Sequence, residues 1–254
     1  MKFSLYQEFY KFVHRKLTWI APLILLLLMI ITGYSIGYHQ GKLLTMTCYN
    51  SPDWIVLILI IVGSTMFSME FQNNAILTLI YKSKSKIQVY LAKYVIIFGY
   101  NLILHGLAIL YTVVLRYATL NSRVSWSTIY RYQQPLWQNM LLTSLVDLLA
   151  TTLIITLVFL LSCLIENNAV VTTLSFLIVF MGQAVSASLL NLGRFTAILK
   201  WNPLNMTNLT RQYYNYVTYF QTSHLLNSQL VVGALLYIVI FFILGYQIFR
   251  SKRF

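Results

Sequence analysis

Six long stretches of apolar residues, separated by shorter polar segments, dominate the pattern along this chain. Each is close to the length of about 20 residues that an α-helix needs to cross a hydrocarbon core of about 30 Å. Lipid offers no partner to backbone N–H and C=O groups, so such stretches are expected to be helical. The predicted spans cover residues 17–38, 54–69, 91–115, 137–161, 169–190 and 230–249.

Composition supports this interpretation. Of the 254 residues, 59% are hydrophobic and only 9% are charged, whereas about a quarter of an ordinary soluble domain is charged. The first stretch is too long for a removable signal peptide and lacks a small-residue cleavage site, so we expect it to remain in the mature protein. The sequence therefore predicts an all-α, multi-pass integral membrane protein with one transmembrane domain over residues 1–254.

The positions of Lys and Arg predict how the spans are oriented. If the N-terminus lies inside, the inner side carries most of the 18 basic residues close to helix ends. These are Lys2, Lys11, Arg15, Lys16, Lys82, Lys84, Lys86, Lys93, Arg250, Lys252 and Arg253. The bias favours both termini in the cytoplasm. The net charge of +13 also suits contact with anionic membrane lipids, so a nucleic-acid partner is not needed to explain it.

The segment before the first span, residues 1–16, has a helical repeat. Phe3, Tyr6, Tyr10 and Val13 line one side of a helix, while basic residues occupy the remaining arc. One interpretation is an amphipathic helix in the inner membrane interface. The other is a positively charged topology anchor without a further role.

The cytoplasmic connection after the second span, residues 70–90, predicts a short helix. Asn73 or Asn74 can cap its N-terminus, and the cations that follow favour its C-terminal end. Its apolar face consists of Ile76, Leu79 and Ile80. Such a helix either folds against the bundle or docks onto a partner.

Residues 191–229 form the longest connection, on the predicted outer side. Asn and Gln alternate there with aromatic residues, and Pro203 lies near the start. The aromatic residues are Trp201, Tyr213, Tyr214, Tyr216, Tyr219 and Phe220. Because aromatic side chains with a polar tip prefer headgroup depth, we expect either short helices that re-enter the outer interface and cap a cavity, or a simple aromatic anchor.

Few residues suggest chemistry. The sequence has no phosphate-loop motif and its histidines are scattered, so we expect no metal site, no cofactor and no enzyme activity in this chain. His105 and Asp147 are ionisable residues inside predicted spans, which makes them candidates for a translocation path or proton relay. Alternatively, hydroxyl groups near Asp147 satisfy it and its role is structural.

The layout resembles the permease subunits of the ABC-2-type export class of ABC transporters. Members have a Glu at the inner end of the second span, then polar residues, a short apolar helix, a basic run and a Lys at the start of the third span. The corresponding positions are Glu70, Asn73 and Asn74, residues 76–80, residues 82–86 and Lys93. The sequence Trp201-Asn202-Pro203-Leu204 is similar to the Asn-Pro that follows the fifth span in many members. This chain lacks the family's usual glycine near residue 74.

The resemblance implies a pore made of two permeases, identical or paralogous, above two separate ATP-binding cassette subunits that carry ATP and Mg²⁺. It also implies that residues 73–81 form the coupling helix that contacts the ATPase. The coupling residues would be Glu70, Asn73, Asn74, Ile76, Leu79 and Ile80. By layout, relatives export drugs, bacitracin, lantibiotics or amphipathic peptide toxins such as phenol-soluble modulins, often in antimicrobial resistance. A bacterial inner membrane is the implied location.

Two other functions fit the residues. A proton-coupled secondary transporter would use His105 and Asp147. A membrane receptor or immunity protein would bind its ligand without transporting it. The neighbourhood of an ATPase gene would favour the permease over both.

Overall fold

The computed structural model describes residues 2–36, 40–72, 85–117, 124–191, 193 and 196–252. Its long elements are α-helices. In chain order they are α1 (Lys2–Val13), α2 (Lys16–Ile36), α3 (Gly41–Met46), α4 (Ser51–Gln72), α6 (Lys86–Leu115), η3 (Arg131–Gln133), α7 (Leu136–Leu164), α8 (Asn168–Asn191), α9 (Thr196–Leu199), α10 (Pro203–Met206), α11 (Leu209–Tyr214), α12 (Tyr216–Ser223) and α13 (Asn227–Ser251).

Within the described residues, six helices are long and apolar enough to cross a membrane, namely α2, α4, α6, α7, α8 and α13. They coincide with the six predicted spans, so the predicted all-α, multi-pass fold class is confirmed. The helices extend past several predicted ends, and α6 starts at Lys86 rather than Leu91. A helix continues into the polar interface because its backbone bonds remain satisfied there.

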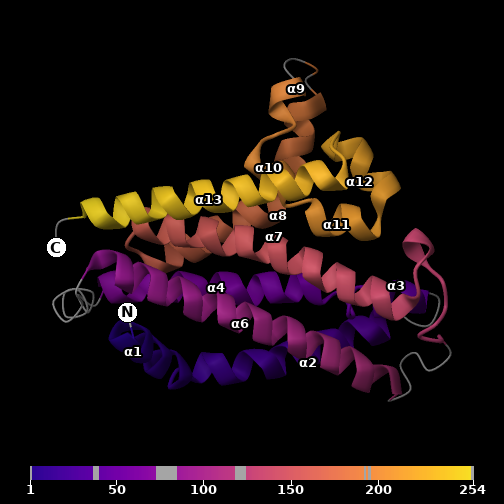
Figure 1. The fold of residues 1–254 in the computed structure, drawn as a ribbon, viewed down its shortest axis with the longest axis horizontal. Helices are drawn as coiled ribbons and strands as arrows, with labels where there is room; N and C mark the ends of the chain where they lie inside the picture. Colours follow the sequence, from indigo (N-terminus) through magenta and orange to yellow (C-terminus); the bar gives the residue numbers. More distant parts are fainter. Residues whose placement is uncertain are drawn as a thin grey trace.

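The long helices lie side by side, and both chain termini lie at the same end of the bundle (Figure 1). The central helices are α4 and α7, in which more than half of the apolar stretch is buried. By contrast, α8 and α13 bury less than a quarter of theirs. Exposed apolar helix faces of this kind are suited to lipid rather than to water.

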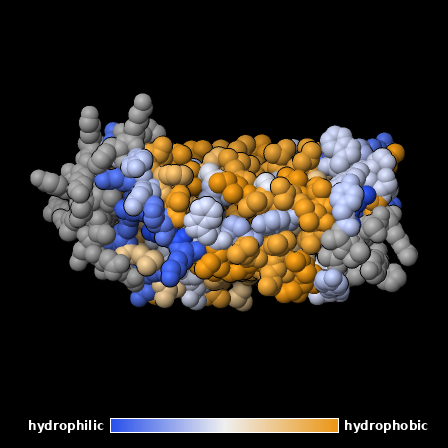
Figure 2. Space-filling model, turned by 90° about the horizontal axis from the view of Figure 1, so that it is seen from below, coloured by the Kyte–Doolittle hydropathy of each residue, from blue (hydrophilic) through white to orange (hydrophobic). Residues whose placement is uncertain are grey.

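A broad hydrophobic band covers the middle of the molecule, and hydrophilic residues gather at its two ends (Figure 2). This distribution is the one that a bilayer imposes on a spanning protein. The band does not say which end faces the cytoplasm, so the orientation of the termini remains a prediction.

The helix before the first span, α1, uses an unexpected face to contact the bundle. Ser4, Glu8 and Phe12 are buried, whereas Tyr6 and Tyr10 of the predicted aromatic stripe are exposed. The buried residues recur every fourth position and so share one side of α1. The aromatic stripe therefore faces away from the protein, which is compatible with a helix in the interface but does not test that placement.

The long connection between α8 and α13 is built from the short helices α9 to α12 and packs into the bundle. Met206 and Leu209 are fully buried with Leu153 of α7 and Leu230 of α13. Buried amides satisfy the irregular backbone of this segment, and Asn205 Nδ2 donates to the carbonyl oxygens of Lys200 and Ser223. Such partners are needed because an unpaired polar group of buried backbone is costly.

Candidate functional site

A buried cluster of four charged side chains joins α1, α4 and α6 at the end of the bundle that holds both termini. The ammonium group of Lys93 is fully buried. Its Nζ atom lies 2.8 Å from Glu8 Oε2 and 2.6 Å from Glu70 Oε2. It also donates to the carbonyl oxygen of Met66 at 2.9 Å. The charge of Lys93 is thus compensated by two carboxylates from different helices.

Lys11 completes this cluster from its outer side. Its Nζ atom lies 3.2 Å from Glu8 Oε1 and 2.9 Å from Glu70 Oε1, so each carboxylate contacts both ammonium groups. Two positive and two negative charges cancel, which makes burial of the group tolerable. Glu70 lies two residues before the end of α4, and Lys93 lies two turns after the start of α6. The cluster therefore includes one residue on each side of residues 73–84 in the sequence.

Of the predicted ATPase-coupling residues, the structure therefore places Glu70 only. Asn73, Asn74, Ile76, Leu79 and Ile80 lie outside the described residues. Their role, and the predicted coupling helix itself, remain predictions.

A second set of contacts ties the C-terminal end of α13 to the same region. Lys86 Nζ donates to the carbonyl oxygens of Arg250 and Lys252, at 3.0 Å and 2.7 Å. Lys252 Nζ lies 2.9 Å from Glu166 Oε1, between α7 and α8, and 4.4 Å from the centre of the Phe71 ring. The ends of α4, α6 and α13 and the connection between α7 and α8 are therefore linked near the two boundaries of residues 73–84.

Deeper in the bundle, the two ionisable residues predicted inside the spans meet. His105 Nε2 of α6 lies 2.9 Å from Asp147 Oδ2 of α7, and both side chains are buried. His105 Nδ1 lies 2.9 Å from the carbonyl oxygen of Asn101, which only accepts, so the network assigns a proton to Nδ1. A second proton must lie between Nε2 and Asp147, on one group or the other.

The His105–Asp147 pair is neutral in either arrangement, which suits its depth. The other carboxylate oxygen, Asp147 Oδ1, accepts a hydrogen bond of 2.9 Å from Thr210 Oγ1. Asn101 Nδ2 donates to Thr151 Oγ1 at 2.9 Å beside the pair. Asp147 therefore connects α6, α7 and α11, and its position on a translocation path remains a prediction.

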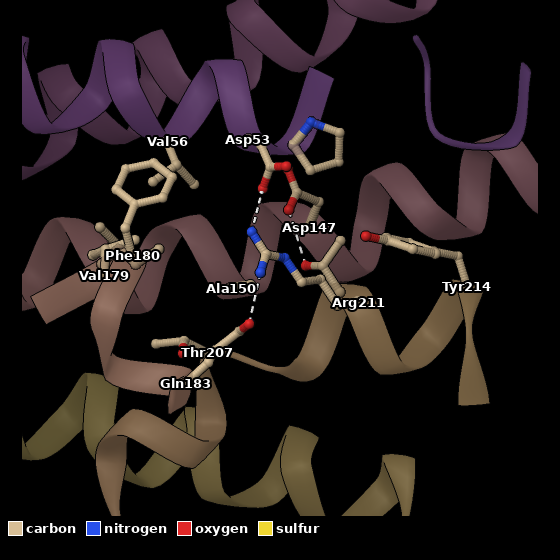
Figure 3. Close-up of a pocket in the computed structure, with 13 residues that line it drawn as sticks. Asp53, Val56, Asp147, Ala150, Val179, Phe180, Gln183, Thr207, Arg211 and Tyr214 are labelled. Atoms are coloured by element: carbon tan, nitrogen blue, oxygen red, sulfur yellow. Dashed lines mark hydrogen bonds and ion pairs between the residues drawn. The ribbon is translucent and has the colours of Figure 1, made fainter. Parts of the chain in front are cut away.

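A small cavity of about 40 Å³ lies beside Asp147, between α4, α7, α8 and α11, and has room for water. Its polar wall is the ion pair between Asp53 Oδ1 and Arg211 Nη2, at 3.0 Å. Arg211 Nη1 also donates to Gln183 Oε1 at 2.6 Å (Figure 3). The apolar residues of the lining are Pro52, Val56, Ala150, Ile154, Val179 and Phe180.

The charge of Arg211 is stable at this place. Burial alone lowers the pKa of Arg211, but the Asp53 carboxylate raises it, and the net change is upward. Arg211 and Thr210 are adjacent in sequence, yet they fasten α11 to three different spans, α4, α8 and α7. The outer connection is thus attached to the polar core of the bundle.

Reasoning from the sequence missed Glu8, Asp53 and Arg211. Only five of the 254 residues are acidic. This scarcity was the available signal for Glu8 and Asp53. Their partners were not readable, because Asp53 and Arg211 are 158 positions apart.

Comparison with known proteins gives one family. The sequence model described as ABC-2 family transporter protein matches residues 4–182. The match includes the Glu8–Glu70–Lys93 cluster and the His105–Asp147 pair, and it ends before Thr210 and Arg211. No curated protein matches the chain.

Proposed function

The chain belongs to the ABC-2 family of transporter proteins, and from this we propose that it is the permease subunit of an exporter that moves an amphipathic or hydrophobic substrate outward. Membership makes it the membrane component of an ABC-2 transporter, which is a non-catalytic subunit without a cofactor of its own. Membership also implies a partner ATPase, which hydrolyses ATP on a separate chain. Export, the substrate class and a second permease copy or paralogue are parts of the proposal.

The buried charge cluster carries the proposal. Glu8, Glu70 and Lys93 join α1, α4 and α6 at the two boundaries of residues 73–84. A displacement of that segment would be transmitted to three helices together, because separating any one of them exposes a buried charge without its partner. This is the mechanical property that a coupling site between ATPase and permease requires.

We assign the ATPase contact to Asn73, Asn74, Ile76, Leu79 and Ile80, and the end with both termini to the cytoplasm. The assignment is supported by the basic residues near this end, since cytoplasmic loops are enriched in Lys and Arg. Each apolar side chain that becomes fully buried in a partner contributes about 1.5 to 3 kcal/mol.

The substrate would pass near the cavity beside Asp147. The Asp53–Arg211 ion pair and Gln183 line this cavity together with apolar side chains that include Val56 and Phe180. A surface with a polar and an apolar side fits an amphipathic molecule, whose two parts need different environments.

Co-purification of the ATPase tests the coupling assignment. The double substitution Ile76→Asp and Leu79→Asp should abolish recovery of the ATPase while the permease still inserts in the membrane. The control is Thr78→Asp, which introduces one negative charge into the same segment at a position outside the proposed contact and should retain the ATPase. Equal recovery of the ATPase with the double variant and with the control would overturn the assignment.

The buried His105–Asp147 pair favours one rival, a proton-coupled secondary transporter. Such a transporter would continue to work on a proton gradient after ATP is depleted, and Asp147→Asn would stop it. The exporter proposed here would stop when ATP is depleted. A receptor or immunity protein would bind substrate in both conditions and transport it in neither.

A further inference from the structure

The corner between α1 and α2 is held in a fixed shape by side chains. α1 ends at Val13 and α2 begins at Lys16. Thr18 Oγ1 donates to the carbonyl oxygen of Phe12 at 2.7 Å, and Trp19 Nε1 donates to that of Val13 at 2.8 Å. The Phe12 carbonyl also accepts from the backbone N–H of Arg15 at 3.2 Å, so Thr18 adds a second bond there, while Trp19 gives a partner to a carbonyl group at the end of α1.

Two consecutive cations, Arg15 and Lys16, lie at this corner. The negative end of the α1 dipole favours cations there. Arg15 Nη1 donates to Thr65 Oγ1 at 3.3 Å, which holds its side chain against α4. Lys16 is exposed and makes no side-chain hydrogen bond within the described part of the chain.

The protein has no carboxylate left to neutralise these two cations. Its five Asp and Glu residues all lie in the described ranges, and each is paired with another cation. The pairs are Glu8 and Glu70 with Lys93 and Lys11, Asp53 with Arg211, Asp147 with His105, and Glu166 with Lys252. No Asp or Glu side chain is therefore available to Arg15 and Lys16, which leaves both cations free to bind an external anion.

The corner lies where the polar end meets the hydrophobic band. Trp19, Leu23 and Leu27 follow Lys16 along one side of α2 and are 66%, 65% and 56% exposed. In Figure 2 the hydrophilic cluster at one end borders directly on the hydrophobic band. An indole ring at such a boundary is typical of headgroup depth.

We propose that Arg15, Lys16 and Trp19 form a binding site for the phosphate headgroup of an anionic phospholipid. The two cations neutralise the negative charge of the phosphate, and the acyl chains lie along Leu23 and Leu27 of α2. Free phosphate would gain nothing from that apolar surface. An acidic soluble partner would leave the same surface uncovered.

Quenching of Trp19 fluorescence by brominated lipids tests this site in the full-length protein. The fluorescence of Trp19 is obtained for each variant by subtracting the fluorescence of the same variant that also carries Trp19→Phe. It is measured in bilayers with brominated phosphatidylglycerol or brominated phosphatidylcholine. In the wild type, phosphatidylglycerol should bind beside Trp19 in preference to phosphatidylcholine, so its brominated form should quench Trp19 more strongly. In the double variant R15Q/K16Q this preference should fall by roughly thirtyfold, as expected for two cations near an anionic surface.

Two variants control this experiment. Lys42→Gln removes an exposed cation from α3 and should leave the preference at Trp19 unchanged. Lys16→Gln alone spares the Arg15–Thr65 hydrogen bond and should reduce the preference by about fivefold, even if the double variant misfolds.

Several results would overturn the proposal. One is an unchanged preference in a folded R15Q/K16Q protein, and another is an equal fall with Lys42→Gln, which would indicate net charge only. Competition by inorganic phosphate alone would show a site for the free anion. Loss of ATPase binding in R15Q/K16Q with an intact lipid preference would show a protein-docking surface instead.

Discussion

Lys93→Met is the sharpest perturbation of the buried charge cluster. Met keeps much of the side-chain volume but removes the buried ammonium group, so Glu8 and Glu70 keep only the more exposed Lys11 as a charged partner. At 2.8 Å and 2.6 Å, each attraction is worth about 6 kcal/mol with an effective dielectric constant of about 20. Desolvation offsets most of this, so we expect a net loss of about 3–5 kcal/mol.

The free energy of unfolding in mixed micelles is the quantity to measure, for the wild type, Lys93→Met, Glu70→Gln and the double variant. Removing the carboxylate charge together with the ammonium charge relieves the unpaired state, so the double variant should lose less than the sum of the two single variants. Lys42→Met, at an exposed position of α3, is the control and should change stability by less than about 0.5 kcal/mol.

Two results would refute this reasoning. The first is a loss below about 1 kcal/mol for Lys93→Met, which would mean that water reaches the cluster and screens it. The second is strict additivity of Lys93→Met and Glu70→Gln, because residues in direct contact are expected to couple.

Three further substitutions test the attachments between helices. Thr210→Val removes the hydrogen bond to Asp147 and should cost about 1–3 kcal/mol, seen as faster proteolysis of the segment between α8 and α13 with the six spans intact. Arg211→Met should expose the same segment to protease, and raising the salt concentration should reduce the difference from wild type if the ion pair is solvent-accessible. Gly245→Ala places a Cβ atom 2.6 Å from the Tyr90 hydroxyl and should lower the free energy of unfolding by about 1–3 kcal/mol.

The six spans were predictable because the bilayer leaves the chain little choice. A run of about 20 apolar residues must form a helix to satisfy its backbone in lipid, and each predicted run coincides with one long helix of the structure, the first ending two residues before its predicted end. His105 and Asp147 could be picked out from the sequence for a similar reason, since ionisable groups inside a span are rare and need partners.

The face that α1 turns to the bundle was not predictable from periodicity. In a soluble protein the aromatic stripe with Tyr6 and Tyr10 would be the packed face. In the structure the stripe faces outward instead, because the buried face of α1 carries Glu8, which pairs with Lys93. Pairing across long sequence separations, such as Asp53 with Arg211, leaves no local pattern to read.

Transport by the reconstituted pair tests the central claim most directly. The permease and its ATPase would be placed together in vesicles, and movement of a fluorescent amphipathic peptide across the bilayer would be followed with and without ATP. The account predicts transport that needs both proteins and ATP, and that continues when an uncoupler removes the proton gradient. Transport without ATP that depends on a proton gradient, and that Asp147→Asn abolishes, would contradict it.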